Sequence, residues 1–259
     1  MELPGIWMRD ILSLLLPHGC AGCGAPDAAL CPSCLDLMDR PVLRRVPGFD
    51  HGVVACGLYE GAMRHAILAW KDHGQAECDR PLGLALAGLA GRMLCPPTEA
   101  RGVPIAPRSR ILVIPAPSSP RSMRRRGRNH MLPLVRATAC GLNALGFEAK
   151  AAAILSSKHV RGKSVHATSV SQRAARIGGR VVVRDSRLVH GENVLLVDDI
   201  VTTGATMRQC AAVLNEAGAH VVMGLALAST RGRDAPRDAT RDRLPSPRPI
   251  SPDRRFLPG

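Results

Sequence analysis

The residues best placed to do chemistry are two adjacent aspartates, Asp198 and Asp199, followed by a turn rich in threonine. The apolar run Val194–Val197 before them predicts a buried strand, and the turn Thr202–Thr206 leads into a helix. Backbone N–H groups and hydroxyls of such a turn can hold a phosphate without a lysine, because the helix behind adds the positive end of its dipole. The carboxylates can accept hydrogen bonds from two vicinal hydroxyls. The pattern favours a sugar phosphate; the simpler alternative is a buried strand with an Asp-Asp turn and a threonine helix cap.

Four of the nine cysteines form two Cys-x-x-Cys pairs with seven residues between them. Two such pairs can complete the tetrahedral shell of Zn²⁺, and the metal would supply most of the stability of so short a segment. The alternatives are two disulfides or a redox pair. No export signal is evident, which disfavours disulfides, and a redox site needs only one pair. We therefore predict a structural zinc site formed by Cys20, Cys23, Cys31 and Cys34. The remaining cysteines are expected to be buried free thiols: Cys56, Cys78, Cys95, Cys140 and Cys210.

The formal net charge of +14 is concentrated in two places. Residues 231–259 carry eight arginines against four aspartates, with repeated proline and serine, and are predicted to be disordered. A second group of arginines lies between Pro115 and Asn129. Either group could bind the phosphates of a small molecule or of DNA. No apolar run is long enough to span a bilayer, and the early run Ile11–Leu16 does not suit a signal peptide, so we expect a cytoplasmic protein.

Strand-like and helix-like segments alternate along the chain, which predicts an α/β fold with a mainly parallel sheet flanked by helices. The strands are expected over Val53–Tyr59, Ile111–Ile114, Ala151–Leu155, Val181–Val183, the run before Asp198, and His220–Leu227; the helices over Gly61–Trp70, Pro81–Leu94, a stretch ending near Leu145, and Ala205–Ala217. The aspartates would then lie at a carboxyl end of the sheet. Three parts follow: a zinc module over 1–40, the α/β domain over 41–230, and the tail 231–259. Within the domain, Pro41–Gly48 is expected to be a connector and Pro115–Asn129 a loop.

The segment from Asp198 to Thr206 resembles the 5-phosphoribosyl-1-pyrophosphate (PRPP) motif of type I phosphoribosyltransferases. With the cysteine pairs, residues 15–230 resemble the ComF family, also called GntX-like or competence-protein F-like phosphoribosyltransferase homologues. The elements occur in the family's order: the cysteine knuckles, the Tyr59-Glu60-Gly61 turn before a helix ending near Lys71, the Ile114–Pro117 strand end, the basic Arg126–Asn129 element and the PRPP motif.

The resemblance implies binding of PRPP with Mg²⁺, which the substrate itself would mainly bring. Asp198 and Asp199 would hold the ribose hydroxyls and favour a positively charged transition state, and in that sense would be the catalytic residues. Arg126 and Arg128 would meet the pyrophosphate. The 5-phosphate would be bound by the turn formed by Thr202, Thr203, Gly204, Ala205 and Thr206. An active protein would be a pentosyltransferase, within the glycosyltransferases, but the resemblance leaves activity and the phosphoribosyl acceptor open.

Two departures from the family pattern bear on function. Arg128 stands where the family usually has an aromatic residue. In the wider superfamily, purine-salvage members carry an aspartate near the base at the position of Thr202, so a purine-salvage role is disfavoured. The alternative function implied by the resemblance is a non-catalytic accessory of DNA uptake during competence, with single-stranded DNA or helicase and recombination proteins as partners. Aromatic residues make up only 2 % of the chain, so the stacking platform usual for single strands is missing. A third possibility is a zinc-stabilised protein that has kept the fold and lost the chemistry.

Overall fold

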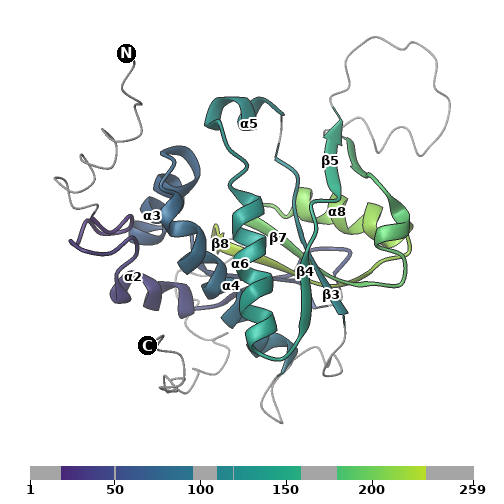
Figure 1. The fold of residues 1–259 in the computed structure, drawn as a ribbon, viewed down its shortest axis with the longest axis horizontal. Coiled ribbons are helices and arrows are strands. Elements are labelled where there is room, and N and C mark those ends of the chain that lie inside the picture. Colours follow the sequence, from purple (N-terminus) through teal and green to yellow (C-terminus); the bar gives the residue numbers. More distant parts are fainter. Residues whose placement is uncertain (1–18, 50, 96–109, 119, 159–179, 232–259) are drawn as a thin grey trace, which may run out of the picture.

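The computed structural model describes residues 19–49, 51–95, 110–118, 120–158 and 180–231 (Figure 1). A six-stranded sheet has the order β1-β2-β8-β7-β3-β4, and all neighbouring pairs are parallel except β1 with β2. Its strands are β1 (Val42–Arg44), β2 (Val53–Leu58), β3 (Arg110–Pro115), β4 (Glu148–Ala151), β7 (Asn193–Val201) and β8 (His220–Ser229). Two further strands, β5 (Leu155–Lys158) and β6 (Arg180–Val183), form a separate antiparallel pair. The predicted α/β class with a mainly parallel sheet is confirmed.

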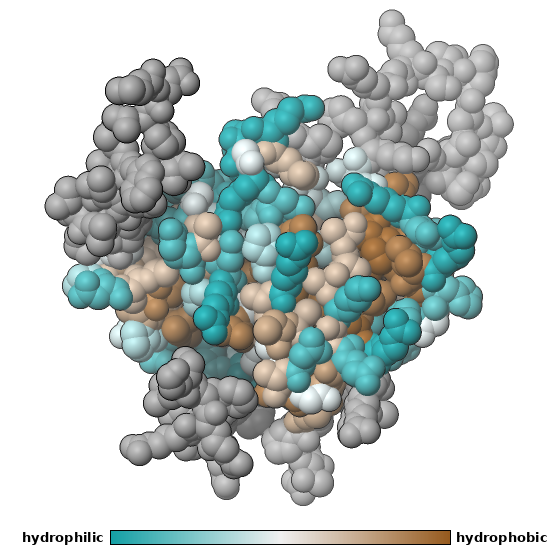
Figure 2. Space-filling view, viewed as in Figure 1, coloured by the Kyte–Doolittle hydropathy of each residue, from teal (hydrophilic) through white to brown (hydrophobic). Residues whose placement is uncertain are grey.

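Helices cover both faces of the sheet because the central strands are apolar on both sides. One core joins the sheet to the cysteine segment, α3 (Gly61–Asp72), α4 (Asp79–Leu94) and α6 (Met131–Ala144). The other core joins the sheet to α8 (Ala205–Glu216) and to the β5–β6 pair. In Figure 1, α6 lies in front of the sheet, with α4 packed next to it, and α8 belongs to the core on the opposite face. Figure 2 shows apolar side chains reaching the surface near α8 and β5, where Val181 and Val183 are only half-buried.

Four predicted elements need correction. The segment 115–129, expected to be a loop, contains the short helix α5 (Pro120–Arg126). The strand expected over 151–155 is replaced by β4 and β5 on either side of it, because the charged Glu148 and Lys150 hid the first from a search for apolar runs. The segment 41–48, expected to be a connector, contributes the edge strand β1. The strand before the turn does not end at the aspartates but runs through them to Val201.

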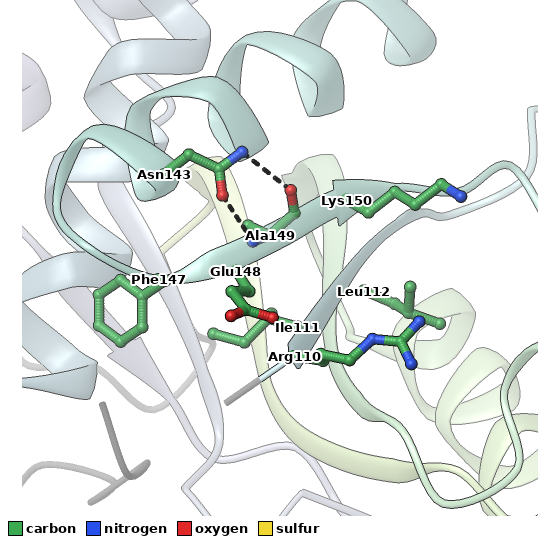
Figure 3. A pocket seen from close by; sticks show the side chains of 8 residues that line it. All are labelled: Arg110, Ile111, Leu112, Asn143, Phe147, Glu148, Ala149 and Lys150. Atoms are coloured by element: carbon green, nitrogen blue, oxygen red, sulfur yellow. Dashed lines mark hydrogen bonds between the residues drawn. The ribbon is translucent and has the colours of Figure 1, made fainter. Parts of the chain in front are cut away.

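At the opposite end of the sheet from the aspartates, the first residues of β3 and β4 border a shallow groove of about 350 Å³ (Figure 3). The side chain of Asn143 accepts a hydrogen bond from the Ala149 N–H at 2.7 Å and donates one to the Ala149 carbonyl at 3.0 Å. Asn143 thereby satisfies both backbone groups of Ala149 on β4, an edge strand of the sheet.

The parts of the chain outside this description include residues 1–18, 159–179 and the tail 232–259, so the predictions for them are untested. Short connections complete the described elements: α2 (Pro32–Asp36) and the 3-10 turns Leu37–Asp39, Ala76–Cys78 and Ser186–Leu188. Among the described helices, none combines the length and the apolar character that a membrane crossing requires.

Candidate functional site

The carboxyl edge of the parallel strands brings together most of the residues singled out above. The segments that follow β2, β3 and β7 lead into α3, α5 and α8 respectively, so all three leave the sheet at this edge. Strand β3 stops at Pro115, which pairs with Val197, and β7 continues beyond it. Asp198 and Asp199 therefore lie just past the end of a neighbouring strand, the usual place for a ligand in an open α/β sheet.

Asp199 is buried and has two polar partners, one of them a cation. Its Oδ2 forms an ion pair with Nζ of Lys71, at the end of α3, and lies 3.2 Å from Nε2 of His130, directly before α6. His130 is 1 % exposed and meets the ring of Trp70 edge-on, with ring centroids 4.9 Å apart. Burial alone would raise the pKa of Asp199, but the His130 hydrogen bond and the Lys71 charge outweigh it and lower this pKa. Asp199 is therefore an anion held by two helices.

Asp198 has a different environment. Consecutive strand residues point to opposite faces of a sheet, and the charge of Asp198 acts on the thiol of Cys210 in α8. Its Oδ1 accepts the N–H of Asp199 at 2.8 Å. Burial, followed by the charge of Asp199, raises the pKa of Asp198 to about 7. The two carboxylates thus differ in the face of the sheet they occupy, in their partners and in their charge. From the sequence, we expected both to accept hydrogen bonds from the same pair of ribose hydroxyls.

The raised pKa of Asp198 predicts a specific dependence of stability on pH. Between about pH 4 and pH 7 the folded chain holds a proton that the unfolded chain has released, so the free energy of unfolding falls as the pH rises through this range. The variant Asp198→Asn should lack this loss. We expect it to be more stable than the wild type at pH 8 by about 1 to 2 kcal/mol, after allowance for solvent around the half-buried carboxyl, and equally stable near pH 4.

Urea unfolding at several pH values measures this difference. Asp185→Asn is the matched control, because that partly exposed carboxyl is paired with Arg187 and its pKa is lowered instead. A control variant that gained as much stability at pH 8 as Asp198→Asn would contradict the assignment of the effect to Asp198.

The threonine turn is exposed to solvent, and residues of β1 and the segment after it support it from the protein side. Gly204 has φ +73° and is the N-cap of α8, and a Cβ on it would lie 2.7 Å from Val46, so only glycine suits this position. Arg44 of β1 donates hydrogen bonds to the carbonyls of Thr202 and Thr230. The other residues of the turn are exposed: Thr202, Thr203, Ala205 and Thr206. Arg44 and Val46 were missed from the sequence, since nothing in a short connector marks it as support for a distant turn.

The arginines expected to meet pyrophosphate are engaged elsewhere. Nε of Arg126 lies 2.9 Å from Asp72 at the end of α3, and Arg125 joins the same carboxylate. Arg128 donates to both oxygens of Asp79, at 3.0 and 3.2 Å, and to the Trp70 carbonyl at 3.2 Å. The pKa of Asp72 is lowered, because the Arg126 bond outweighs the effect of burial. These contacts fasten the segment between α5 and α6 to α3 and α4.

The four paired cysteines come together as predicted. The sulfur atoms of Cys20, Cys23, Cys31 and Cys34 all lie within 4.8 Å of one another, and the Cys31 N–H points at the Cys20 sulfur at 3.2 Å. Burial raises the pKa of Cys20, but amide hydrogen bonds outweigh it and lower this pKa to about 6, which favours the thiolate that a metal needs. Burial and the neighbouring sulfur atoms raise the pKa of Cys34, so a metal would have to displace the proton of that thiol. The donor set fits a tetrahedral ion such as Zn²⁺. Of the remaining five thiols, Cys95 and Cys140 are exposed, contrary to expectation.

The cysteine cluster packs directly on the helices that carry the site. A Cβ on Gly22 would lie 3.1 Å from the Ala62 carbonyl in the first turn of α3. Cys78, next to Asp79, directs its thiol at the Ala29 carbonyl within the cluster segment at 3.6 Å. The position of α3, and with it Lys71, therefore depends on this segment.

The match to one protein-family model supports the fold. A family model described as the phosphoribosyl transferase domain matches residues 142–251, which include β7, the turn and α8. One similar solved structure, "Structure of the allosteric regulatory enzyme of purine biosynthesis", has 16 % identity over 62 % of this chain and a TM-score of 0.40. Another, glutamine PRPP amidotransferase from B. subtilis complexed with ADP and GMP, has 14 % identity over 61 % and a TM-score of 0.37. This chain spans 30 % of each of them. No curated protein matches the sequence.

Proposed function

We propose that the chain binds PRPP with Mg²⁺ at the carboxyl edge of the sheet, as a phosphoribosyltransferase homologue of the ComF type. The observation that carries the proposal is the exposed turn at the start of α8, with Gly204 in the left-handed conformation and two carboxylates a few residues upstream. The amides of this turn and the helix dipole would bind the 5-phosphate. The order of cysteine cluster, basic segment and PRPP motif supports the ComF assignment and structural zinc.

The two aspartates would hold the ribose in different ways. Both neighbours of Asp199 approach Oδ2, and within the described part of the chain no hydrogen bond reaches its Oδ1. Oδ1 of Asp199 and the half-buried Asp198 would accept the ribose hydroxyls, with the Asp198 side chain turning from its bond to the Asp199 amide. Negative charge beneath the ring would stabilise the positive charge that develops when pyrophosphate leaves C1. A nitrogen nucleophile would then bond to C1.

An accessory role in DNA uptake is less well supported. Arg125, Arg126 and Arg128 are paired with Asp72 and Asp79, so in the described part of the chain this segment offers DNA less free positive charge than the sequence suggested. We retain PRPP as the proposed small-molecule partner.

Calorimetric titration with PRPP and Mg²⁺ tests the proposal. The wild type should bind, and Gly204→Ala should weaken binding about 10-fold or more, because the new Cβ would push the turn away from Val46 at a conformation that already disfavours side chains. Gly191→Ala is the matched control: Gly191 also has φ +72°, but a Cβ added there would have no atom within 4 Å, and the residue is remote from the turn. Absence of heat with the wild type would refute PRPP binding. If the wild type binds PRPP, the release of pyrophosphate with any of a panel of nitrogenous acceptors would indicate an enzyme. No release with any of them would indicate a PRPP sensor.

A further inference from the structure

We infer that Lys71 is the residue that receives the pyrophosphate group of the bound sugar phosphate, an inference that rests on the proposed function. Among the described residues, Lys71 is the only lysine or arginine that forms an ion pair with an aspartate of the motif, Asp199. The side chain of Lys71 is 17 % exposed. In PRPP the pyrophosphate is attached to C1, next to the carbon that bears the 2-hydroxyl. A ligand whose 2-hydroxyl is accepted by Asp199 therefore brings its pyrophosphate to the ammonium group of Lys71.

Three of the competing cations in this region, Arg125, Arg126 and Arg128, are already engaged. Arg126 and Arg125 share Asp72, and Arg128 is bidentate on Asp79, so each would have to break a charge-assisted bond before binding phosphate. Arg126 is also held close to the protein, with 10 % of its side chain exposed. Pairing with Asp72 and Asp79 is sufficient to explain these arginines as structural ties between helices.

Lys71 can leave Asp199 without exposing a bare buried charge. His130 contacts the same Oδ2 and is itself fixed against Trp70, whose indole N–H donates to Asp79 at 2.6 Å. When the ammonium moves to pyrophosphate, His130 keeps the carboxylate in place. Lysine suits this exchange because its ammonium is a compact charge on a flexible stem, here on the last turn of α3.

The role of Lys71 is to hold charge, without transferring a proton. The bond between C1 and the pyrophosphate oxygen breaks with its electron pair leaving on pyrophosphate. The acceptor nitrogen forms the new bond to C1 and releases the proton it carried to water. Lys71 donates hydrogen bonds to the departing group. The same contact would act on bound PRPP and on free pyrophosphate, and it would be absent with ribose 5-phosphate, which carries no group at C1 except hydroxyl.

Calorimetry with the full chain tests this selectivity. Lys71→Met keeps the apolar stem and removes the charge, and we expect it to weaken Mg²⁺–PRPP binding about 10- to 100-fold while changing ribose 5-phosphate binding less than about 3-fold. Lys150→Met is the control, because Lys150 is an exposed lysine of β4 at the other end of the sheet. An equal loss for both ligands, or no loss for PRPP, would overturn the role of Lys71. A wild type that fails to bind PRPP would instead refute the proposed function.

A second measurement uses the wild type and does not depend on the folding of the variant. Brief acylation with acetic anhydride, followed by mass spectrometry of peptides, reports the reactivity of each lysine amine. Mg²⁺–pyrophosphate and Mg²⁺–PRPP should protect Lys71, ribose 5-phosphate should not, and Lys150 should react equally in every sample. Protection of Lys71 by ribose 5-phosphate as strong as that by PRPP, or no protection by either pyrophosphate ligand, would overturn the inference.

Discussion

Replacing Cys34 with serine is expected to release the metal from the four-cysteine cluster and to cost the protein much of its stability. The segment 19–36 has only short elements of its own, and Cys34 is buried against the core of the sheet. Metal binding supplies most of the folding free energy of such segments, so the loss should be at least about 3 kcal/mol, or roughly 10 °C in Tm for a domain of this size. The wild type should carry one zinc per chain by elemental analysis, and the variant much less.

Cys140→Ser provides the control for the metal measurement, because it makes the same chemical change at an exposed thiol of α6. It should retain zinc and melt with the wild type. A strong chelator should lower the Tm of the wild type toward that of Cys34→Ser. If Cys34→Ser kept a full equivalent of zinc, or if metal removal left the Tm unchanged, the cluster would not be a structural metal site.

The effect of the metal should extend to the sugar-phosphate site. The cluster segment contacts α3 through Gly22 and Ala62, and the start of α4 through Ala29 and Cys78. These helices position Lys71 and Asp79. Loss of the cluster would therefore also reduce affinity for PRPP, even though none of the four cysteines is a proposed ligand of PRPP.

Local sequence signals were sufficient for the central part of the fold. The apolar run before Asp198, the glycine of the turn and the helix that follows are contiguous, and each has a conformational preference that the structure follows in β7, Gly204 and α8. The two Cys-x-x-Cys pairs were equally readable, because each pair fixes the direction of its own thiols. Contiguous motifs of this kind carry their geometry with them.

The partners of the site residues could not be read in this way, because they come from distant parts of the chain. Lys71, His130 and Asp199 meet only after α3, α6 and β7 have packed. Arg126 and Arg128 looked like free phosphate ligands because the acids that neutralise them, Asp72 and Asp79, lie about fifty residues earlier. Basic residues in a sequence show where charge is present, and only the packed structure shows whether that charge is already paired.

Asp199→Asn is expected to abolish PRPP binding and to lower the free energy of unfolding by about 3 kcal/mol, because it leaves Lys71 and His130 without their anion in a buried setting. Asp198→Asn is expected to raise the free energy of unfolding at pH 8, so the two neighbouring substitutions should change stability in opposite directions. Calorimetry and urea unfolding at pH 8 measure both effects.

The double variant Asp199→Asn with Lys71→Met distinguishes loss of charge balance from loss of a ligand contact. Removing the lysine charge as well should restore most of the lost stability, because the uncompensated ammonium causes most of the penalty. It should not restore PRPP binding, because the hydroxyl acceptor and the pyrophosphate ligand would both be absent. A double variant that remained as unstable as Asp199→Asn would show that Lys71 and Asp199 are not energetically coupled. Recovery of PRPP binding would show that Asp199 does not bind the sugar, and its assignment as an acceptor of a ribose hydroxyl would have to be abandoned.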